Sequence, residues 1–217
     1  MRTRLIPIFI SVLIVVCGGL GSHTLMRVDQ DLRVIYTEYT LAATDLGHLN
    51  GELIRYRTSV IRAIETESKD EFYRIVASLP EKRSRIDKAI ERFVAATDDA
   101  STGKSLDARE LSELKAVQER IASYMASSHH AIQMMEQRWD VESVLNAQRL
   151  QNQAREYLAN DAGNKYMSVT VELDRLLEVV ATIAGDVKKE ADVMLRGITV
   201  VLILVSLTLG VLVLTIS

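Results

Sequence analysis

The pattern of apolar and polar positions divides the chain into two uniformly apolar ends and a long amphipathic middle. Residues 5–25 carry no formal charge apart from the titratable His23, and residues 198–217 carry none. Each segment has about 20 residues, which at about 1.5 Å per residue matches the roughly 30 Å hydrocarbon core of a bilayer. Because both segments are apolar on every face, we expect two membrane-spanning helices, 5–25 and 198–217, with 1–4 as a short flank.

Between these ends, over residues 26–197, apolar residues recur every three or four positions, which is typical of amphipathic helices. Four such stripes follow one another, and we expect one helix for each. In chain order the stripes are Leu46, Leu49, Leu53, Tyr56, Val60 and Ile64; Phe72, Ile75, Leu79, Ile86, Ile90 and Phe93; Leu111, Leu114, Val117, Ile121, Met125, Ile132 and Met135; and Tyr166, Val169, Leu173, Leu176, Val180, Val187, Ala191 and Met194.

Polar breaks separate the stripes. The first helix is expected to run from the first span to about Thr66, and Ser68 followed by Glu71 has the spacing of a capping box at the start of the second. Pro80 is expected to kink the second helix or to mark an irregular start. Residues 97–103 have no periodicity, and Ser105 or Asp107 is the expected cap of the third helix.

Residues 137–164 have a helical composition but no clear stripe. They can extend either neighbouring helix or form a short helix of their own at the end of the bundle. The run 160–164, Asn-Asp-Ala-Gly-Asn, predicts a break before the fourth helix.

Helices with a single apolar face are not stable alone and must bury these faces against one another. The short connections near Ser68 and Trp139 favour antiparallel neighbours. We therefore predict an all-α fold, an elongated antiparallel up-down-up-down four-helix bundle continuous with the two transmembrane helices.

Charge and composition narrow the function. The net charge is −3 with 25% charged residues, so the mixed, slightly acidic surface argues against a nucleic-acid partner. The single cysteine, Cys17, excludes an internal disulfide framework. Arg2 and Arg4 in the N-terminal flank favour a cytoplasmic N-terminus, which places the bundle on the far side of a bacterial inner membrane, in the periplasm.

The sequence offers little catalytic or metal-binding chemistry. His129 and His130 are adjacent, so on a helix they diverge by about 100° and cannot easily bind one ion. Met134 and Met135 have the helical spacing of core residues. No cysteine–histidine haem motif, glycine-rich phosphate loop or serine nucleophile elbow is present, so we expect no cofactor, no metal and no enzymatic activity.

The order of these features resembles the four-helix-bundle ligand-sensing module of methyl-accepting chemotaxis proteins. The resemblance covers nearly all of the chain and rests on two spans that flank a bundle, together with residues 46–57, residues 82–90, residues 110–114 and Tyr124.

This resemblance implies a signal-transducing sensor that forms a homodimer through its first helix. It also implies a small ligand, such as a carboxylate, or a periplasmic protein as partner. In related receptors, arginines of the first helix bind ligand carboxylates. The matching residues here are Arg55, Arg57 and Arg62, with the hydroxyls of Ser168 and Thr170 as further ligand contacts.

An alternative remains open for these arginines. Exposed arginines on a helix commonly pair with acidic residues three or four positions away, and Glu52, Glu65 and Glu67 are available on the same helix.

The sequence also departs from the family pattern, because no HAMP linker or cytoplasmic signalling hairpin follows residues 198–217. Either the chain is part of a longer sensor, or it is an accessory subunit that docks other membrane-complex subunits through its bundle. The reading frame beyond Ser217 distinguishes the two.

Overall fold

The structure is a computed structural model that describes residues 18–19, 21–22, 26, 40–97 and 108–216. Within these ranges the regular structure is helical, without a strand. The principal elements are α2 (Leu41–Glu65), α3 (Lys69–Thr97), α4 (Ala108–Trp139), α5 (Val144–Tyr157), the π-helical segment η3 (Leu158–Ala162) and α6 (Gly163–Ile216). The chain divides into a bundle unit, Glu38–Ala181, and a second unit formed by Met1–Thr37 and Thr182–Ser217.

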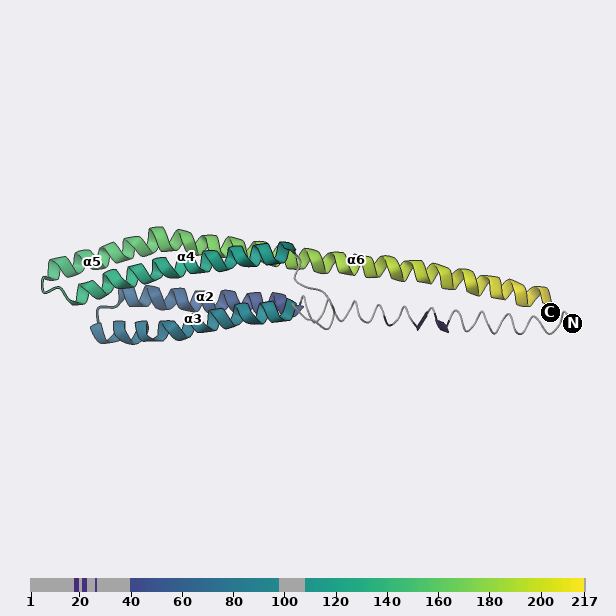
Figure 1. The fold of residues 1–217 in the computed structure, drawn as a ribbon, viewed down its shortest axis with the longest axis horizontal. Helices are drawn as coiled ribbons and strands as arrows, with labels where there is room; N and C mark the ends of the chain where they lie inside the picture. Colours follow the sequence, from purple (N-terminus) through teal and green to yellow (C-terminus); the bar gives the residue numbers. More distant parts are fainter. Residues whose placement is uncertain (1–17, 20, 23–25, 27–39, 98–107, 217) are drawn as a thin grey trace. The chain divides into compact units, whose positions relative to one another are not determined.

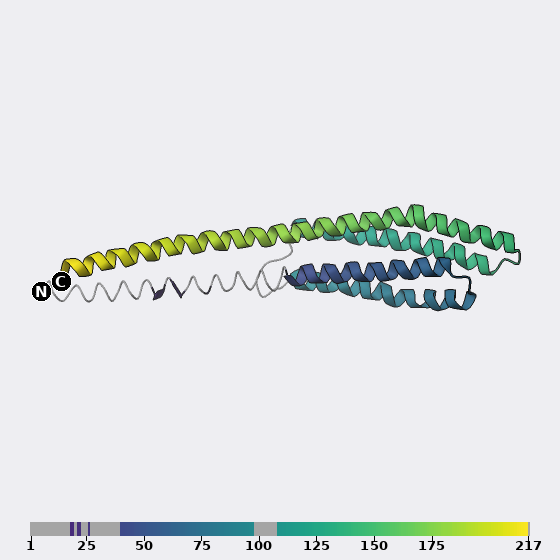
Figure 2. The ribbon, with the colours of Figure 1, turned by 180° about the vertical axis from the view of Figure 1, so that it is seen from behind.

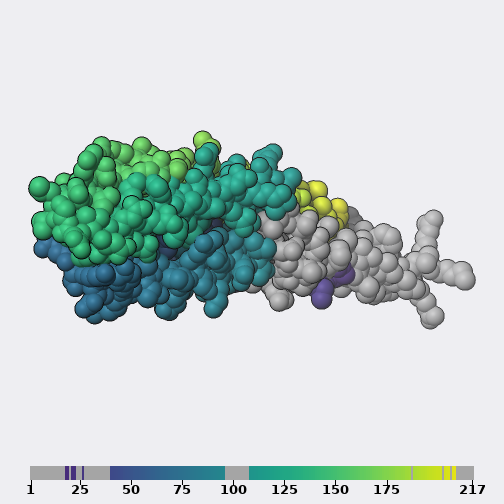
Figure 3. Space-filling view, turned by 60° about the vertical axis from the view of Figure 1, so that its left-hand side comes forward, coloured from purple at the N-terminus to yellow at the C-terminus, as the bar shows by residue number. Residues whose placement is uncertain are grey.

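The bundle unit consists of two helical hairpins. In the first hairpin, α3 returns along α2. In the second, α5 and η3 return along α4 (Figures 1 and 2). The hairpins contact each other where α2 meets α4 and α5, and the space-filling view shows the two halves in contact along the bundle (Figure 3). The all-α four-helix bundle predicted from the stripes is thus confirmed.

The predicted stripes supply most of the core of this unit; the fourth contributes Tyr166, Val169, Leu173, Leu176 and Val180, whereas its last positions, Ala191 and Met194, belong to the second unit. In α2 and α3 every predicted stripe residue is buried, and Leu49, Leu53 and Phe72 have no exposed surface. In α4 the prediction is wrong at Leu111, which is 41% exposed, because the stripe reaches the core one turn later at Leu114. Burial of these side chains stabilises the bundle, at about 1.5–3 kcal/mol for each large apolar side chain that leaves water.

The α2–α3 connection uses the predicted capping spacing. The backbone N–H of Glu71 donates to the Ser68 hydroxyl at 3.3 Å. The Glu71 carboxylate then accepts from the Thr66 hydroxyl at 3.1 Å and from Arg62 at 3.2 Å. The acidic side chain at the start of α3 also favours the positive end of the helix dipole.

The expected irregular start at Pro80 is wrong, since α3 begins at Lys69 and continues through Pro80 to Thr97. Pro80 lies on the exposed face of the helix. There its ring avoids the core, although its missing N–H leaves one helical carbonyl without a backbone donor.

Residues 137–164 are the segment that the sequence left open. Helix α4 ends at Trp139, and α5 begins at Val144. The break predicted at residues 160–164 is wrong, because η3 carries the chain into α6 through Gly163, whose φ of −61° and ψ of −47° are helical. The fourth rod of the bundle is therefore α5, η3 and the first part of α6.

The second unit contains the remainder of α6, from Thr182 onward. The span predicted at 5–25 lies largely outside the described residues, as do residues 27–39 and the caps Ser105 and Asp107. Of the helices in the described ranges, none is long and apolar enough to cross a membrane. The segment 198–216 is part of α6, and a membrane-spanning role for 5–25 and 198–217 stays a prediction.

Candidate functional site

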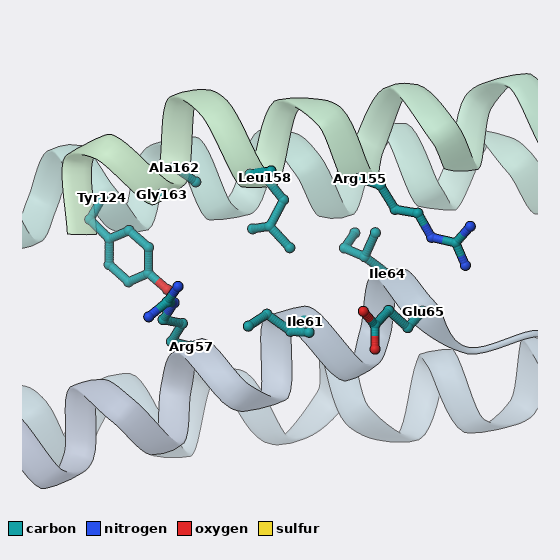
Figure 4. A pocket seen from close by; sticks show the side chains of 10 residues that line it. Arg57, Ile61, Ile64, Glu65, Tyr124, Arg155, Leu158, Ala162 and Gly163 are labelled. Atoms are coloured by element: carbon teal, nitrogen blue, oxygen red, sulfur yellow. The ribbon is translucent and has the colours of Figure 1, made fainter. Parts of the chain in front are cut away.

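A pocket of about 360 Å³ lies inside the bundle unit, between α2 and the α5–η3–α6 rod (Figure 4). Tyr124 of α4 closes one end of it. The lining residues are Arg57, Ile61, Ile64, Glu65, Tyr124, Arg155, Leu158, Ala159, Ala162 and Gly163. This volume is in the range of about 300–1,000 Å³ that is usual for small-molecule sites.

The pocket has an apolar middle and two polar ends. Figure 4 shows Arg57 and the Tyr124 hydroxyl together at one end, and Glu65 and Arg155 at the other, with the side chains of Ile61 and Leu158 between them. A small ligand with an apolar body and a polar group at one end would be complementary to this pocket.

Tyr124 is the most deeply buried polar group of the lining, with 1% of its surface exposed. Its ring contacts Tyr56 and Tyr166 edge-on, at centroid distances of 6.1 and 5.4 Å. Its hydroxyl forms no hydrogen bond of regular geometry within the described residues, although the Ser128 hydroxyl, one turn further along α4, lies close enough to lower the pKa of Tyr124 slightly. Burial raises the pKa of Tyr124, so this hydroxyl stays protonated and can donate at neutral pH.

Arg57 reaches the same end of the pocket from α2. Its guanidinium stacks over the Tyr166 ring, 4.4 Å from the centroid. No carboxylate of the described residues forms an ion pair with it. A stacked guanidinium still presents N–H groups at its edge, so Arg57 can bind an anion while Tyr166 holds it in position.

The opposite end of the pocket carries one charge of each sign. Arg155 of α5 and Glu65 of α2 both line it and both are exposed, and neither forms an ion pair within the described residues. The lining therefore holds two arginines and one glutamate, with the unbalanced positive charge at the Arg57 end.

The other two predicted arginines lie outside the pocket lining. Arg55 forms an ion pair with Glu52 of its own helix, as the alternative interpretation expected. Arg62 pairs with Glu71 of α3 at 3.2 Å and so belongs to the α2–α3 connection.

The two predicted hydroxyls bond within their own helix. Ser168 donates to the Asn164 carbonyl at 3.1 Å, and Thr170 donates to the Tyr166 carbonyl at 3.2 Å. Neither is part of the lining. Of the five residues predicted as ligand contacts, the structure brings only Arg57 to the pocket; the ligand role of all five stays a prediction.

Two features of the pocket, Arg155 and the small side chains of η3, were not predicted from the sequence. Both fall in residues 137–164, where no clear stripe assigned a face to each residue. A signal was available for Tyr124, because Tyr56, Tyr124 and Tyr166 each occupy a core position of a different predicted helix.

Beside the pocket, η3 is fixed to α4 by a polar cluster. Lys165 donates to Asp161 at 2.9 Å and to the Ser127 hydroxyl at 2.5 Å, and Ser127 donates to Asp161 at 2.7 Å. Hydrogen bonds from Lys165, Ser127 and Tyr157 lower the pKa of Asp161 to about 2. Asp161 in turn raises the pKa of Lys165. Lys165 therefore stays protonated and cannot act as a base that accepts the proton of Ser127. The cluster thus has a structural role, which is to connect η3 to α4.

The adjacent histidines have different neighbours. His129 contacts Gln133 at 3.2 Å, and the His130 ring packs against Tyr157 at a centroid distance of 4.8 Å. In the part of the chain that the structure describes, no group of three His, Cys, Asp or Glu side chains could hold a metal ion.

Comparison with known proteins gives one family. The family described as a four-helix-bundle sensory module for signal transduction matches residues 1–195. Neither a curated protein nor a solved structure matches the chain.

Proposed function

The chain belongs to the family of four-helix-bundle sensory modules for signal transduction, and on this premise we propose that it senses a small ligand in its bundle and transmits the event through α6. Ligand binding would displace α6 along α2 by roughly 1–2 Å, which is a usual size for helix shifts in switching proteins.

One observation carries this proposal. Helix α6 begins at Gly163, which lines the pocket, and continues without interruption for 54 residues to Ile216. A continuous helix resists compression and bending because each turn is hydrogen-bonded to the next. A change at the pocket wall can therefore move residues that belong to the second unit.

The proposal includes the membrane arrangement expected from the sequence. Residues 5–25 and 198–217 would span a bacterial inner membrane, with the N-terminus in the cytoplasm and the bundle in the periplasm. Two copies would associate through the first helix. The absence of formal charge from 198–217 and the two arginines of the N-terminal flank support this arrangement.

Calorimetry tests the sensing role. The full chain, purified in detergent, is titrated with a panel of amino acids and small organic acids. We expect at least one member to bind with a one-to-one stoichiometry per bundle or per pair of bundles. A panel without any binder contradicts the proposal that the ligand is a small molecule.

A further inference from the structure

We propose that the pocket within a single bundle binds a branched aliphatic monocarboxylate, whose carboxylate meets Arg57 and Tyr124 and whose apolar body lies against Ile61 and Leu158. This proposal deepens the sensing role and rests on it for its biological purpose. The proposed contacts all come from a single protomer.

The Tyr124 hydroxyl points to a ligand with a hydrogen-bond acceptor. A buried hydroxyl that lacks a well-formed hydrogen bond is costly, and this hydroxyl faces the pocket in Figure 4. Burial keeps the phenol protonated, so it can donate to a group that enters the pocket, and the neighbouring Arg57 guanidinium favours an acceptor over a donor at that place.

Arg57 specifies the charge of that acceptor. Its guanidinium lies at the same end of the pocket as the Tyr124 hydroxyl, and within the described ranges it has no carboxylate partner. A carboxylate there would accept a charge-assisted hydrogen bond from Arg57 and a second bond from the phenol. A neutral amide of the same shape would lose the charge-assisted contribution.

The walls specify the apolar body. Ile61, Ile64 and Leu158 are aliphatic; Ile61 and Leu158 face each other across the middle of the pocket, and Ile64 lies toward the end that carries Glu65 and Arg155 (Figure 4). The wall from η3 and α6 is made of small residues, Ala159, Ala162 and Gly163, which leave the space open. The π-helical geometry widens this turn, and such turns recur at functional sites.

The far end offers no net positive charge to a second carboxylate. Glu65 lies there beside Arg155, so repulsion from Glu65 offsets the attraction of Arg155 for the second charge of a dicarboxylate that reached from Arg57. The aliphatic middle adds the cost of partly desolvating that second charge. A monocarboxylate avoids this cost.

The test is calorimetry of the full chain with three probes of similar size. These are 4-methylpentanoate, its amide 4-methylpentanamide, and the dicarboxylate hexanedioate. We expect 4-methylpentanoate to bind about tenfold more tightly than the amide, the difference expected from one charge-assisted hydrogen bond. We also expect it to bind more tightly than hexanedioate, whose second carboxylate must be partly desolvated.

Substitutions of pocket residues test whether 4-methylpentanoate binds in this pocket. Tyr124→Phe and Arg57→Gln should each weaken 4-methylpentanoate about tenfold or more, and Ala159→Trp should abolish its binding by filling the pocket from an exposed position. Arg85→Gln is the matched control, because Arg85 lies on α3, is exposed and pairs with Glu81. Circular dichroism checks that each variant folds. If Tyr124→Phe does not fold, the test rests on Arg57→Gln, because Arg57 is exposed and its replacement does not disturb the core.

Equal affinity for the acid and the amide overturns the assignment, as does 4-methylpentanoate binding that survives both Arg57→Gln and Ala159→Trp, or no binding at millimolar concentration.

The failure of the pocket assignment can be distinguished from the failure of the proposed sensing role. If another panel member binds the original chain and Ala159→Trp equally well, the sensing role stands and the pocket assignment is wrong. If 4-methylpentanoate binds in the pocket but α6 does not move, the pocket assignment stands and the transmission is wrong.

Discussion

Leu53 and Ile54 are neighbours in α2, yet they have opposite environments. Leu53 has no exposed surface, whereas Ile54 is 48% exposed. Consecutive residues of a helix point about 100° apart, so the difference follows from the apolar stripe and not from the nature of the side chains.

Leu53→Ala should lower the free energy of unfolding by about 2–5 kcal/mol, because it removes buried methyl groups and leaves a cavity. Ile54→Ala, the matched control, should cost less than about 1 kcal/mol. Urea denaturation followed by circular dichroism measures both. Equal losses for the two variants would contradict the assignment of the core face.

Gln151 is a buried polar residue that the stripes did not reveal. It is 2% exposed, and its side-chain amide donates to the Ile64 carbonyl at 3.0 Å. Ile64 lies in the last turn of α2, where carbonyls lack a partner within the helix. Gln151 therefore ties the end of α2 to α5.

Gln151→Leu keeps a similar volume but leaves the Ile64 carbonyl buried without a donor, so stability should fall by about 1–3 kcal/mol. Gln148→Leu is the control, because Gln148 is exposed and bonds only locally to Asn152. Denaturant titration compares the two. A Gln151→Leu protein as stable as the control would show that the buried bond contributes nothing.

The cluster around Asp161 predicts a dependence on pH. Its pKa is lowered to about 2, mainly by the hydrogen bond from Lys165. A carboxyl whose pKa is lower in the folded state stabilises the fold above its unfolded pKa of about 3.9, and this contribution is lost as the pH falls toward 2.

The melting temperature of Asp161→Asn should therefore lie below that of the original chain at pH 7, and the gap should close as the pH falls from about 4 to about 2. Scanning calorimetry at several pH values measures it. A gap that stays constant over this range would mean that the Asp161 charge does not stabilise the fold.

Single residues were predictable where a repeating pattern fixed their environment. All the stripe residues of α2 and α3 proved buried, because a period near 3.6 places them on one face. Arg55, Arg57 and Arg62 could not be separated in this way. Which of them reaches a pocket depends on partners such as Tyr166 and Glu71, which come from other helices.

At the level of elements, η3 is the feature that local sequence signals described wrongly. Asparagine, aspartate and glycine favour turns in isolation, so residues 160–164 predicted a break. In the bundle, Asp161 is tied to Lys165 and Ser127, and Ala162 is fully buried. The contact with Ser127 of α4 and the burial of Ala162 are tertiary; together with the local ion pair between Asp161 and Lys165 they hold the segment helical and override the turn preference.

A π-helical turn accommodates one more residue than an α-helical turn. Deletion of Ala159 should therefore convert η3 into ordinary α-helix while the buried faces of α5 and α6 keep their partners, and the melting temperature should fall by only a few degrees. Deletion of Asp174, in the regular part of α6, should rotate Leu176 and Val180 by about 100° away from the core and cost considerably more.

Thermal unfolding of the two deletion variants compares them directly. An Ala159 deletion as damaging as the Asp174 deletion would show that η3 is not a one-residue insertion into the helix. A melting temperature close to that of the original chain would show that the fold does not require the widened turn.

At the scale of the molecule, the four rods of the bundle unit followed from the sequence within the described residues, because four apolar faces have no other partners. The pocket did not follow from it. Its ends are formed by Tyr124 of α4, Arg57 of α2 and Arg155 of α5, and their meeting depends on the register between the rods. Apolar positions that repeat about once per turn match one another again after a shift of one turn, so the stripes alone do not determine this register.

The proposed membrane arrangement predicts which side of the membrane the bundle faces. With Cys17 replaced by serine, Asn152→Cys on the exposed face of α5 should react with a membrane-impermeant maleimide in intact spheroplasts. Gel-shift analysis measures the labelling, and a cytoplasmic protein with an exposed cysteine is the control. Labelling that requires lysis of the cells would place the bundle in the cytoplasm.

The central claim is that an event in the bundle moves α6. Spin labels at two exposed positions, Asn50→Cys of α2 and Asp174→Cys of α6, report the distance between these helices in the full chain with Cys17 replaced by serine. Pulsed electron-spin resonance compares the unliganded chain with the chain saturated by 4-methylpentanoate or by a panel member that binds. A shift of about 1–2 Å in the mean distance is the predicted result; an unchanged distance distribution at full saturation would contradict the claim.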